Sequence, residues 1–132
     1  MGARILVIED NPTNLELITY LLNAFGHTTI VARDGEEGVE AALRTEPDLV
    51  LCDIALPKLD GYGVARRLRT ASTLNGVPLI AVTASAMVGD RDKVVASGFD
   101  GYISKPITPE TFVAEVEAYL HRREGHGDDP GR

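Results

Sequence analysis

Short apolar runs alternate along this chain with longer segments in which apolar residues recur every three or four positions. The short runs are typical of strands that are buried on both faces of a sheet, and the longer segments are typical of helices that cover such a sheet. We expect strands over residues 4–8, 27–32, 49–52, 77–82 and 99–104. We expect helices over about 12–25, 36–44, 61–70, 87–97 and from 109 to 121.

Local turn and capping signals support these boundaries. Asn11-Pro12 and Thr108-Pro109 each place a capping side chain before a proline, whose missing N–H costs nothing in the first helical turn. Asp34-Gly35 indicates a turn into a helix, and Gly26 and Gly98 are typical helix ends.

The alternation of strands and helices predicts an α/β fold with a parallel sheet and helices on both faces. Right-handed crossovers limit the possible strand orders, and we expect a doubly wound (βα)5 domain with the order 2-1-3-4-5. The domain should span residues 1–121. Residues 122–132 are rich in Gly, Asp and Pro and should form a flexible tail.

The first expected helix has more apolar positions than one packing face needs: Leu15, Leu17, Ile18, Leu21, Leu22 and Phe25. Burial of all of them in the core is the commoner arrangement. The alternative is an exposed apolar edge that is available to a partner.

Composition narrows the class of protein. With 132 residues and a net charge of -7, the chain is one acidic domain, and the charge argues against binding to nucleic acid or to an anionic membrane. Its single cysteine, Cys52, fits a reducing compartment and is expected to act as a small buried hydrophobe. There is no signal-peptide pattern and no apolar run of about 20 residues, so we expect a cytoplasmic protein.

The third expected strand ends on an acid at Asp53, and Pro57 and Gly61 then turn the chain away from the sheet. Ligands of open α/β sheets bind at this carboxyl edge, which makes Asp53 a candidate functional residue. Taken alone, an aspartate at a strand end is equally well explained as a turn or cap residue.

The other strand ends add chemistry to the same edge. In the order 2-1-3-4-5 they bring together Glu9, Asp10, Asp53, Thr83 and Lys105. Carboxylates this close repel one another unless a cation joins them, and a few hard oxygen ligands suit Mg²⁺. The histidines show no metal-ligand spacing, so we expect surface or structural roles for His27, His121 and His126.

This set of groups favours phosphoryl transfer to an aspartate. The Asp53 carboxylate would be the nucleophile, and Mg²⁺ and Lys105 would offset the charge on the phosphoryl oxygens. The Thr83 hydroxyl would bind one of those oxygens.

At these positions the chain resembles the receiver domain of two-component response regulators, over residues 4–121. The resemblance rests on Glu9-Asp10, on Asp53 followed by Pro57 and Asp60-Gly61, on Thr83-Ala84 and on Lys105-Pro106. Each motif is weak alone, but their order at successive strand ends is specific. Residues 8–11 and 81–87 look most similar to stand-alone regulators of the DivK type and to receivers of hybrid kinases.

The resemblance implies a CheY-like, flavodoxin-like fold and a defined magnesium site. Asp10, Asp53 and the backbone carbonyl of Ala55 would bind Mg²⁺ directly, and Glu9 would act through water. The phosphoryl group would come to Asp53 from a phosphohistidine of a histidine kinase or a phosphotransfer protein. A cis peptide bond before Pro106 is also implied.

The resemblance further implies a switch. On phosphorylation Thr83 would move toward the phosphate and Tyr102 would turn inward. The face formed by the fourth helix, the fifth strand and the last helix would change, and with it the binding of a downstream protein.

Other functions remain open from the sequence. A phosphatase on this fold needs a second acid two residues after its nucleophile, where this chain has Ala55. A flavin carrier needs a phosphate-binding loop after the first strand, where Glu9 and Asp10 would repel phosphate. We therefore expect no enzyme, and the remaining alternative is a receiver from a hybrid kinase or larger regulator.

Overall fold

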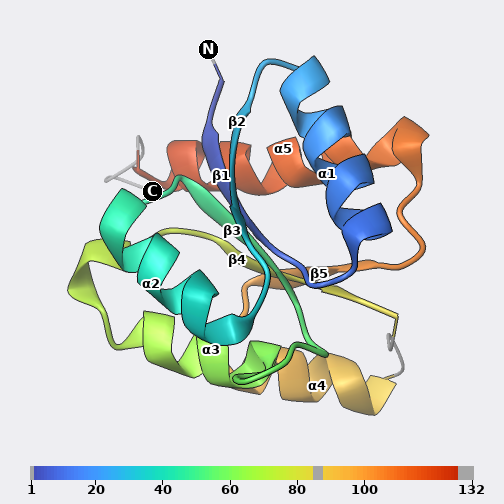
Figure 1. Cartoon of the computed structure of the whole chain (residues 1–132). Helices are drawn as coiled ribbons and strands as arrows, with labels where there is room; N and C mark the ends of the chain where they lie inside the picture. Colours follow the sequence, from blue (N-terminus) through green and yellow to red (C-terminus); the bar gives the residue numbers. More distant parts are fainter. Residues whose placement is uncertain (1, 85–87, 128–132) are drawn as a thin grey trace.

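The computed structural model describes the backbone of residues 2–84 and 88–127 and the side chains of residues 2–84 and 91–121. Strands and helices alternate along these residues (Figure 1). The elements are β1 (Arg4–Ile8), α1 (Pro12–Ala24), β2 (Thr28–Ala32), α2 (Gly35–Thr45), β3 (Leu49–Asp53), α3 (Gly61–Arg69), the 3₁₀-helix η1 (Ser72–Leu74), β4 (Leu79–Thr83), α4 (Val88–Ala96), β5 (Gly101–Ser104) and α5 (Pro109–Gly127).

The strands form one sheet in the order β2-β1-β3-β4-β5, and every neighbouring pair is parallel. Helices α1 and α5 lie on one side of the sheet, and α2, α3 and α4 lie on the other (Figure 1). The predicted doubly wound α/β fold and its strand order are thus confirmed. In this order β3 is the central strand, so its carboxyl end lies between those of β1 and β4.

Each strand contributes alternate side chains to two cores. On β1, Ile5 and Val7 belong to the core under α1 and α5, whereas Leu6 and Ile8 belong to the core under the other helices. Phe112 of α5 is fully buried and is among the largest such side chains. Burial of one large apolar side chain contributes about 1.5–3 kcal/mol, so packing on both faces holds the strand ends in place.

The helix starts follow the predicted caps. Asn11 accepts a hydrogen bond from Asn14 N–H at 3.0 Å, and Pro12 takes the first helical position of α1. Asp34 caps α2 and Asp60 caps α3 through the same kind of bond.

Some boundaries differ from the prediction. β4 begins at Leu79 rather than at residue 77, because Pro78 has no N–H with which to pair. β2 begins at Thr28, because His27 N–H still bonds to Leu22 O in the turn that ends α1. β5 begins at Gly101, since the Asp100 side chain bonds across to Leu79 N–H.

The last helix is longer than expected. α5 continues to Gly127, so residues 122–127, which we assigned to the tail, are helical. Arg122, Arg123 and Glu124 are good helix formers and favour the first part of the extension, whereas Gly125 and Gly127 do not. Residues 128–132 of the predicted tail, and Met87 of the predicted fourth helix, lie outside the described residues.

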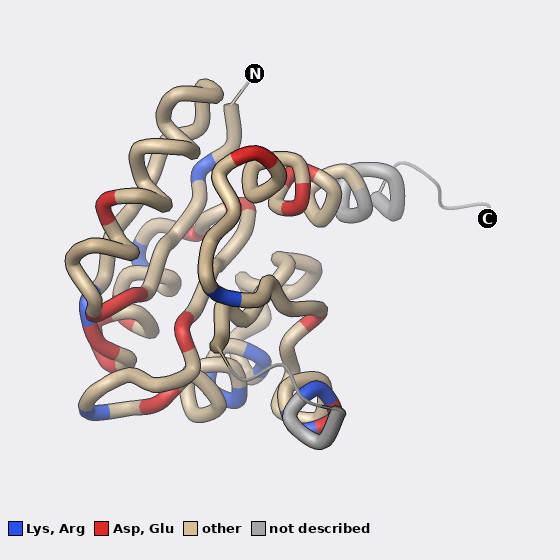
Figure 2. The backbone as a smooth tube through the Cα atoms, turned by 90° about the vertical axis from the view of Figure 1, so that its right-hand side faces the viewer, with Lys and Arg blue, Asp and Glu red and all other residues tan. Residues whose placement is uncertain are grey.

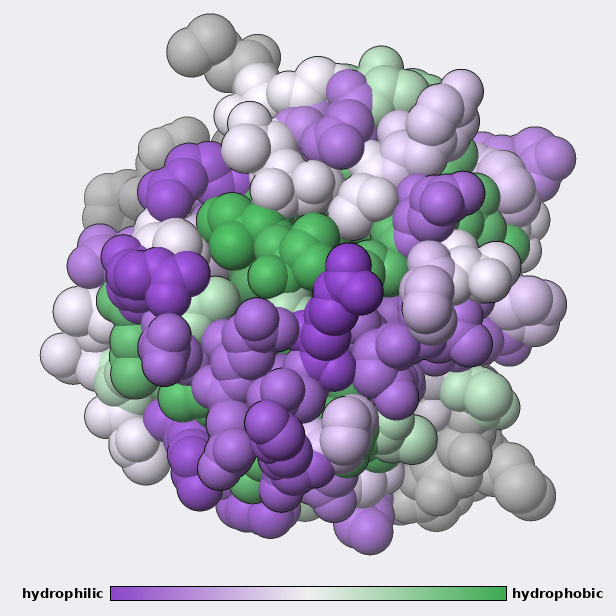
Figure 3. Space-filling view, viewed as in Figure 1, coloured by the Kyte–Doolittle hydropathy of each residue, from purple (hydrophilic) through white to green (hydrophobic). Residues whose placement is uncertain are grey.

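Helix α1 only partly fills the core. Four of its six apolar positions are buried, and Leu17 is half-buried, but Phe25 at its end is 62% exposed. Burial of all six was therefore wrong at Phe25. On the face shown in Figure 3 a further apolar area lies over the edge strand β2, where Ile30 is half-buried and Val31 is exposed.

Polar contacts close the amino edge of the sheet. Ala3 N–H donates to His27 Nδ1 at 3.0 Å, and His27 Nε2 lies 2.8 Å from Glu117 Oε2. Arg4 N–H donates to Asp48 Oδ2 at 2.8 Å. His27 is buried in this structural role and His121 is exposed, as expected, whereas the side chain of His126 lies outside the described residues.

A larger clamp on the same edge joins α3 to β4 and β5. Arg69 donates to Gly98 O at 2.7 Å and to Asp100 Oδ2 at 2.6 Å. The same Asp100 oxygen accepts Leu79 N–H at 2.8 Å. The Arg69 guanidinium therefore helps to hold the first residues of β4 and β5 in place.

Candidate functional site

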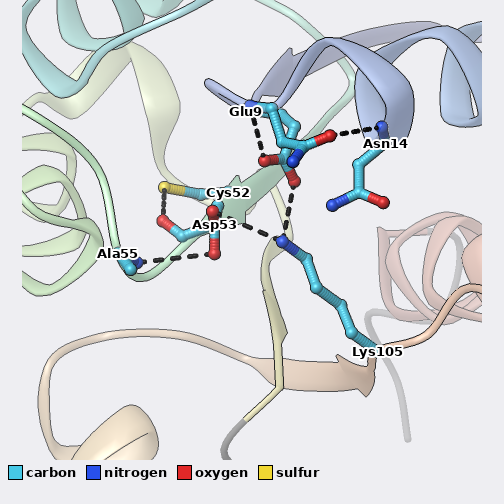
Figure 4. Close-up of polar contacts among 7 residues, drawn as sticks. Glu9, Asn14, Cys52, Asp53, Ala55 and Lys105 are labelled. Carbon is cyan, nitrogen blue, oxygen red and sulfur yellow. Dashed lines mark hydrogen bonds and ion pairs between the residues drawn. The ribbon is translucent and has the colours of Figure 1, made fainter.

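Asp53 ends β3 and is 7% exposed (Figure 4). Its Oδ1 accepts a long hydrogen bond from Ala55 N–H at 3.4 Å, and its Oδ2 lies 3.4 Å from Lys105 Nζ. These contacts hold the carboxylate at the sheet edge but leave much of its capacity to accept hydrogen bonds unused.

The turn after Asp53 depends on Gly61. Gly61 N–H donates to Ile54 O at 2.8 Å, which folds the loop back onto the end of β3. A Cβ at residue 61 would come within 2.5 Å of Asp53 O, so a larger residue would displace the loop beside the carboxylate. The start of α3 therefore packs closely against the backbone of Asp53, the candidate phosphoacceptor.

Glu9 follows β1 and is 2% exposed. Its Oε2 accepts a hydrogen bond from Asn11 N–H at 3.1 Å. Its Oε1 lies 3.0 Å from Lys105 Nζ, outside hydrogen-bonding geometry, and finds no hydrogen-bond donor within the part of the chain that the structure describes. Burial raises the pKa of Glu9, and the nearby Asp53 charge adds to this effect, while Lys105 opposes it.

Lys105 follows β5 and reaches back across the edge toward both acids (Figure 4). Its backbone N–H donates to Thr83 O at 2.8 Å, and the Lys105–Pro106 peptide bond is cis, as the resemblance implied. Burial alone would lower the pKa of Lys105, but Glu9 and Asp53 together raise it. The ammonium therefore stays charged at neutral pH.

Cys52 precedes Asp53 and points into the core. It is 1% exposed, and burial raises the pKa of its thiol well above the usual value, with nearby Asp53 adding to the shift. A protonated, buried thiol is unreactive, which agrees with the predicted role as a small hydrophobe.

Three carboxylates meet at this edge. One oxygen atom from each of Glu9, Asp10 and Asp53 lies within 4.8 Å of the others. Hard oxygen donors, and a buried Glu9 oxygen that has an ion pair but no hydrogen-bond donor among the described residues, fit a Mg²⁺ ion. Ala55 lies beside them in an exposed position, and its role as a carbonyl ligand stays a prediction.

The two predicted switch residues lie on neighbouring strands. Thr83 ends β4, is 5% exposed and pairs in register with Ser104 of β5. Tyr102 of β5 is half-buried, and the guanidinium carbon of Arg91 lies 5.2 Å from its ring centroid. The contact with Arg91 was not predicted, because no local signal in the sequence places α4 over β5.

One part of the acidic site was not predicted from the sequence. Asn11 was expected only to cap α1, but its backbone N–H also holds the Glu9 carboxylate. A hydrogen bond from a backbone N–H does not depend on the residue type. The only signal for it in the sequence was the short spacing between the end of the first strand and the start of the first helix.

Comparisons with known proteins agree with this geometry. The polar-differentiation response regulator DivK of Brucella anthropi is 39% identical over 120 residues, which cover 91% of this chain and 98% of DivK. The receiver domain of a sensor histidine kinase from Pseudomonas aeruginosa, solved with a magnesium ion in its active-site cleft, is 37% identical with a TM-score of 0.82, over 95% of this chain and 99% of that one.

A CheY-like receiver domain protein from Methanospirillum hungatei has a TM-score of 0.87 at 25% identity, over 96% of this chain and 99% of that one. The family of response regulator receiver domains matches residues 5–117. The match covers β1 from its second residue, the other four strands whole and all the acidic-site residues. The chain therefore belongs to the response regulator receiver domain family.

Proposed function

We propose that this chain is a phosphoacceptor in a two-component phosphorelay and that Asp53 is the residue modified. The observation that carries the proposal is the half-satisfied Asp53 carboxylate, with the Lys105 ammonium 3.4 Å away and two further acids beside it. The likeness to DivK supports the same conclusion.

The proposed step moves a phosphoryl group from nitrogen to oxygen. An Asp53 carboxylate oxygen attacks the phosphorus of a phosphohistidine on a kinase or phosphotransfer protein. The N–P bond breaks as the O–P bond forms, and the imidazole keeps the electron pair and then takes up a proton. Lys105 stabilises the negative charge on the phosphoryl oxygens, and the Thr83 hydroxyl binds one of them in the product.

Glu9, Asp10 and Asp53 would hold Mg²⁺ at this edge, with the Ala55 carbonyl as a further oxygen ligand. The bound ion supplies positive charge that offsets the phosphoryl oxygens. Without a cation the clustered carboxylates repel both one another and an incoming phosphoryl group, so the reaction should depend on Mg²⁺.

Phosphorylation would then act as a switch between two conformations. Thr83 and Tyr102 respond to the new charge, and the face of α4, β5 and α5 changes its affinity for a downstream protein. We propose that the protein works in the cytoplasm, through protein partners and without nucleic acid or membrane. No helix among the described residues is long and apolar enough to cross a membrane.

We propose no enzymatic turnover of small substrates, because residue 55 is alanine where a phosphatase of this fold needs an acid. The alternative is that the chain acts as the receiver module of a hybrid histidine kinase or larger regulator. The likeness to the receiver of the Pseudomonas kinase supports it, and the chemistry at Asp53 is the same in both cases.

Labelling with acetyl phosphate tests the proposal. Wild-type protein should take up one labelled phosphoryl group with Mg²⁺ and none when the metal is chelated. Asp53→Asn should take up none. Asp60→Asn is the matched control, because asparagine can still cap α3 and the acid lies outside the metal cluster. Equal labelling of Asp53→Asn and wild type would refute the proposal.

A further inference from the structure

A pocket of about 620 Å³ lies beside β5 and the first half of α5. The residues that line it include Tyr102, Ser104, Lys105, Thr108, Glu115 and Tyr119. Two aromatic rings, hydroxyl groups and one carboxylate thus share a single hollow.

The two tyrosines come from different elements. Glu115 and Tyr119 lie one turn apart on α5 and therefore on the same side of that helix. The Tyr119 hydroxyl packs directly on Gly101 of β5, where a Cβ would collide with it. Tyr102 is the next residue of β5 and points to the opposite face of the sheet, so it lines the pocket from the other side of the edge strand β5.

The charge in the pocket is negative. Glu115 is exposed, and its Oε1 accepts a hydrogen bond from the Thr111 hydroxyl at 3.2 Å, which leaves the carboxylate charge in place. The ammonium of Lys105 is turned to the acidic site, 3.0 Å from Glu9 Oε1. Figure 2 shows further acidic positions along α5, and the net charge of the chain is -7.

One of the rings already contacts a guanidinium. Arg91 lies 5.2 Å from the Tyr102 centroid, within the range of a cation–π interaction. One face of the Tyr102 ring is therefore already covered by a cation of this chain, which leaves the Tyr119 ring and the Glu115 carboxylate for a partner.

From these features we infer that the pocket is the receptor for an arginine side chain of a protein partner. The guanidinium lies against the Tyr119 ring and pairs with the Glu115 carboxylate. Arginine fits better than lysine because its planar cation stacks on rings and can donate two parallel hydrogen bonds to a carboxylate. The inference rests on the proposed function, because it names the chemistry of the partner at the β5–α5 part of the output face.

An NMR titration of the full chain with N-acetyl-arginine amide tests this inference. The amides of Tyr102, Ser104, Glu115 and Tyr119 should shift in a saturable way. N-acetyl-citrulline amide, which has the same shape without the charge, should bind about fivefold more weakly, as expected for the loss of one partly exposed ion pair.

Matched variants locate the binding site. Glu115→Gln should weaken binding of the arginine probe about fivefold. Glu110→Gln removes an exposed acid from the first turn of the same helix, outside the pocket, and should leave binding unchanged. Equal binding of the two probes, equal effects of the two variants, or no saturable shift in the pocket would overturn the inference.

The titration uses unphosphorylated protein without Mg²⁺, so its result is independent of phosphoryl transfer. Asp53→Asn should bind the arginine probe as wild type does. Failure of labelling at Asp53 together with normal probe binding would refute the proposed function and leave the pocket standing. Normal labelling at Asp53 without probe binding would refute the arginine pocket and leave the proposed function standing.

Discussion

Polar residues at the amino ends of the strands and at their carboxyl ends, here called the amino edge and the carboxyl edge, are bonded in opposite ways. At the amino edge, Asp100 bonds to Arg69 and to a backbone N–H, and His27 bonds to Glu117 and to another backbone N–H. At the carboxyl edge, three carboxylates face one ammonium, and a buried Glu9 oxygen has no hydrogen-bond donor among the described residues.

This difference separates stability from function. Charges whose hydrogen bonds are complete stabilise the folded chain, because removing one partner exposes the desolvation cost of the other. Carboxylates that lack hydrogen-bond donors or enough positive charge nearby raise the energy of the unliganded site. They can therefore bind an added cation. The comparison predicts that substitutions at the amino edge change stability and that those at the carboxyl edge change ligand binding.

The largest expected effect on stability is at the amino-edge clamp. Asp100→Ala should lower the free energy of unfolding by about 2 kcal/mol, because Arg69 and Leu79 N–H lose their shared acceptor, whose side chain is half exposed. Denaturant unfolding measures this change. Asp92→Ala, an exposed acid of α4, serves as control and should change stability by less than about 0.5 kcal/mol. Labelling at Asp53 should persist in both variants, and equal stability of the two would contradict this account of the clamp.

The second effect is stabilisation by Mg²⁺ at the carboxyl edge. At ten times its dissociation constant, Mg²⁺ should raise the free energy of unfolding by about 1.4 kcal/mol. Asp10→Asn removes a member of the acidic cluster and should lose most of this gain. Asp48→Asn, at the amino edge, should keep it. A thermal-shift titration with Mg²⁺ measures all three proteins, and an equal response of the two variants would show that the acidic cluster is not the Mg²⁺ site.

The smallest effect concerns pH and Cys52. The folded-state pKa of this thiol is raised above the unfolded value of about 9.0, so its contribution to stability is full below that pH and is lost as pH rises. Between about pH 7 and about pH 9.5 this loss should reach about 0.8 kcal/mol.

Urea unfolding at several pH values measures the loss. Cys52→Ala has no thiol and provides the reference, so the difference in stability between the two proteins should shrink as pH rises. A difference that stays constant would show that the thiol ionises equally in the folded and unfolded chains.

The features that were predictable from the sequence are those with a local signal. The run that ends on Asp53 and breaks at Pro57 and Gly61 placed a carboxylate at the sheet edge, and the order of the strands then joined it to Lys105. Functional residues that follow each strand can be predicted from the sequence, because the carboxyl ends of parallel strands all lie on the same side of the sheet.

The features that were missed depend on contacts between distant residues. His27 and Glu117 are 90 positions apart, and Arg69 reaches Asp100 over 31 positions. Nothing in either local sequence specifies the partner, because the geometry comes from packing of the helices on the sheet. The stacking of Arg91 on Tyr102 was missed for the same reason.

Mapping the phosphoryl group by mass spectrometry tests the central claim most directly. Protein is treated with acetyl phosphate and Mg²⁺, the acyl phosphate is trapped by reduction with borohydride, and the modified residue is identified by peptide sequencing. We expect one modified residue, Asp53, and none in the presence of a chelator. Modification at another residue, or of Asp53 without Mg²⁺, would contradict it.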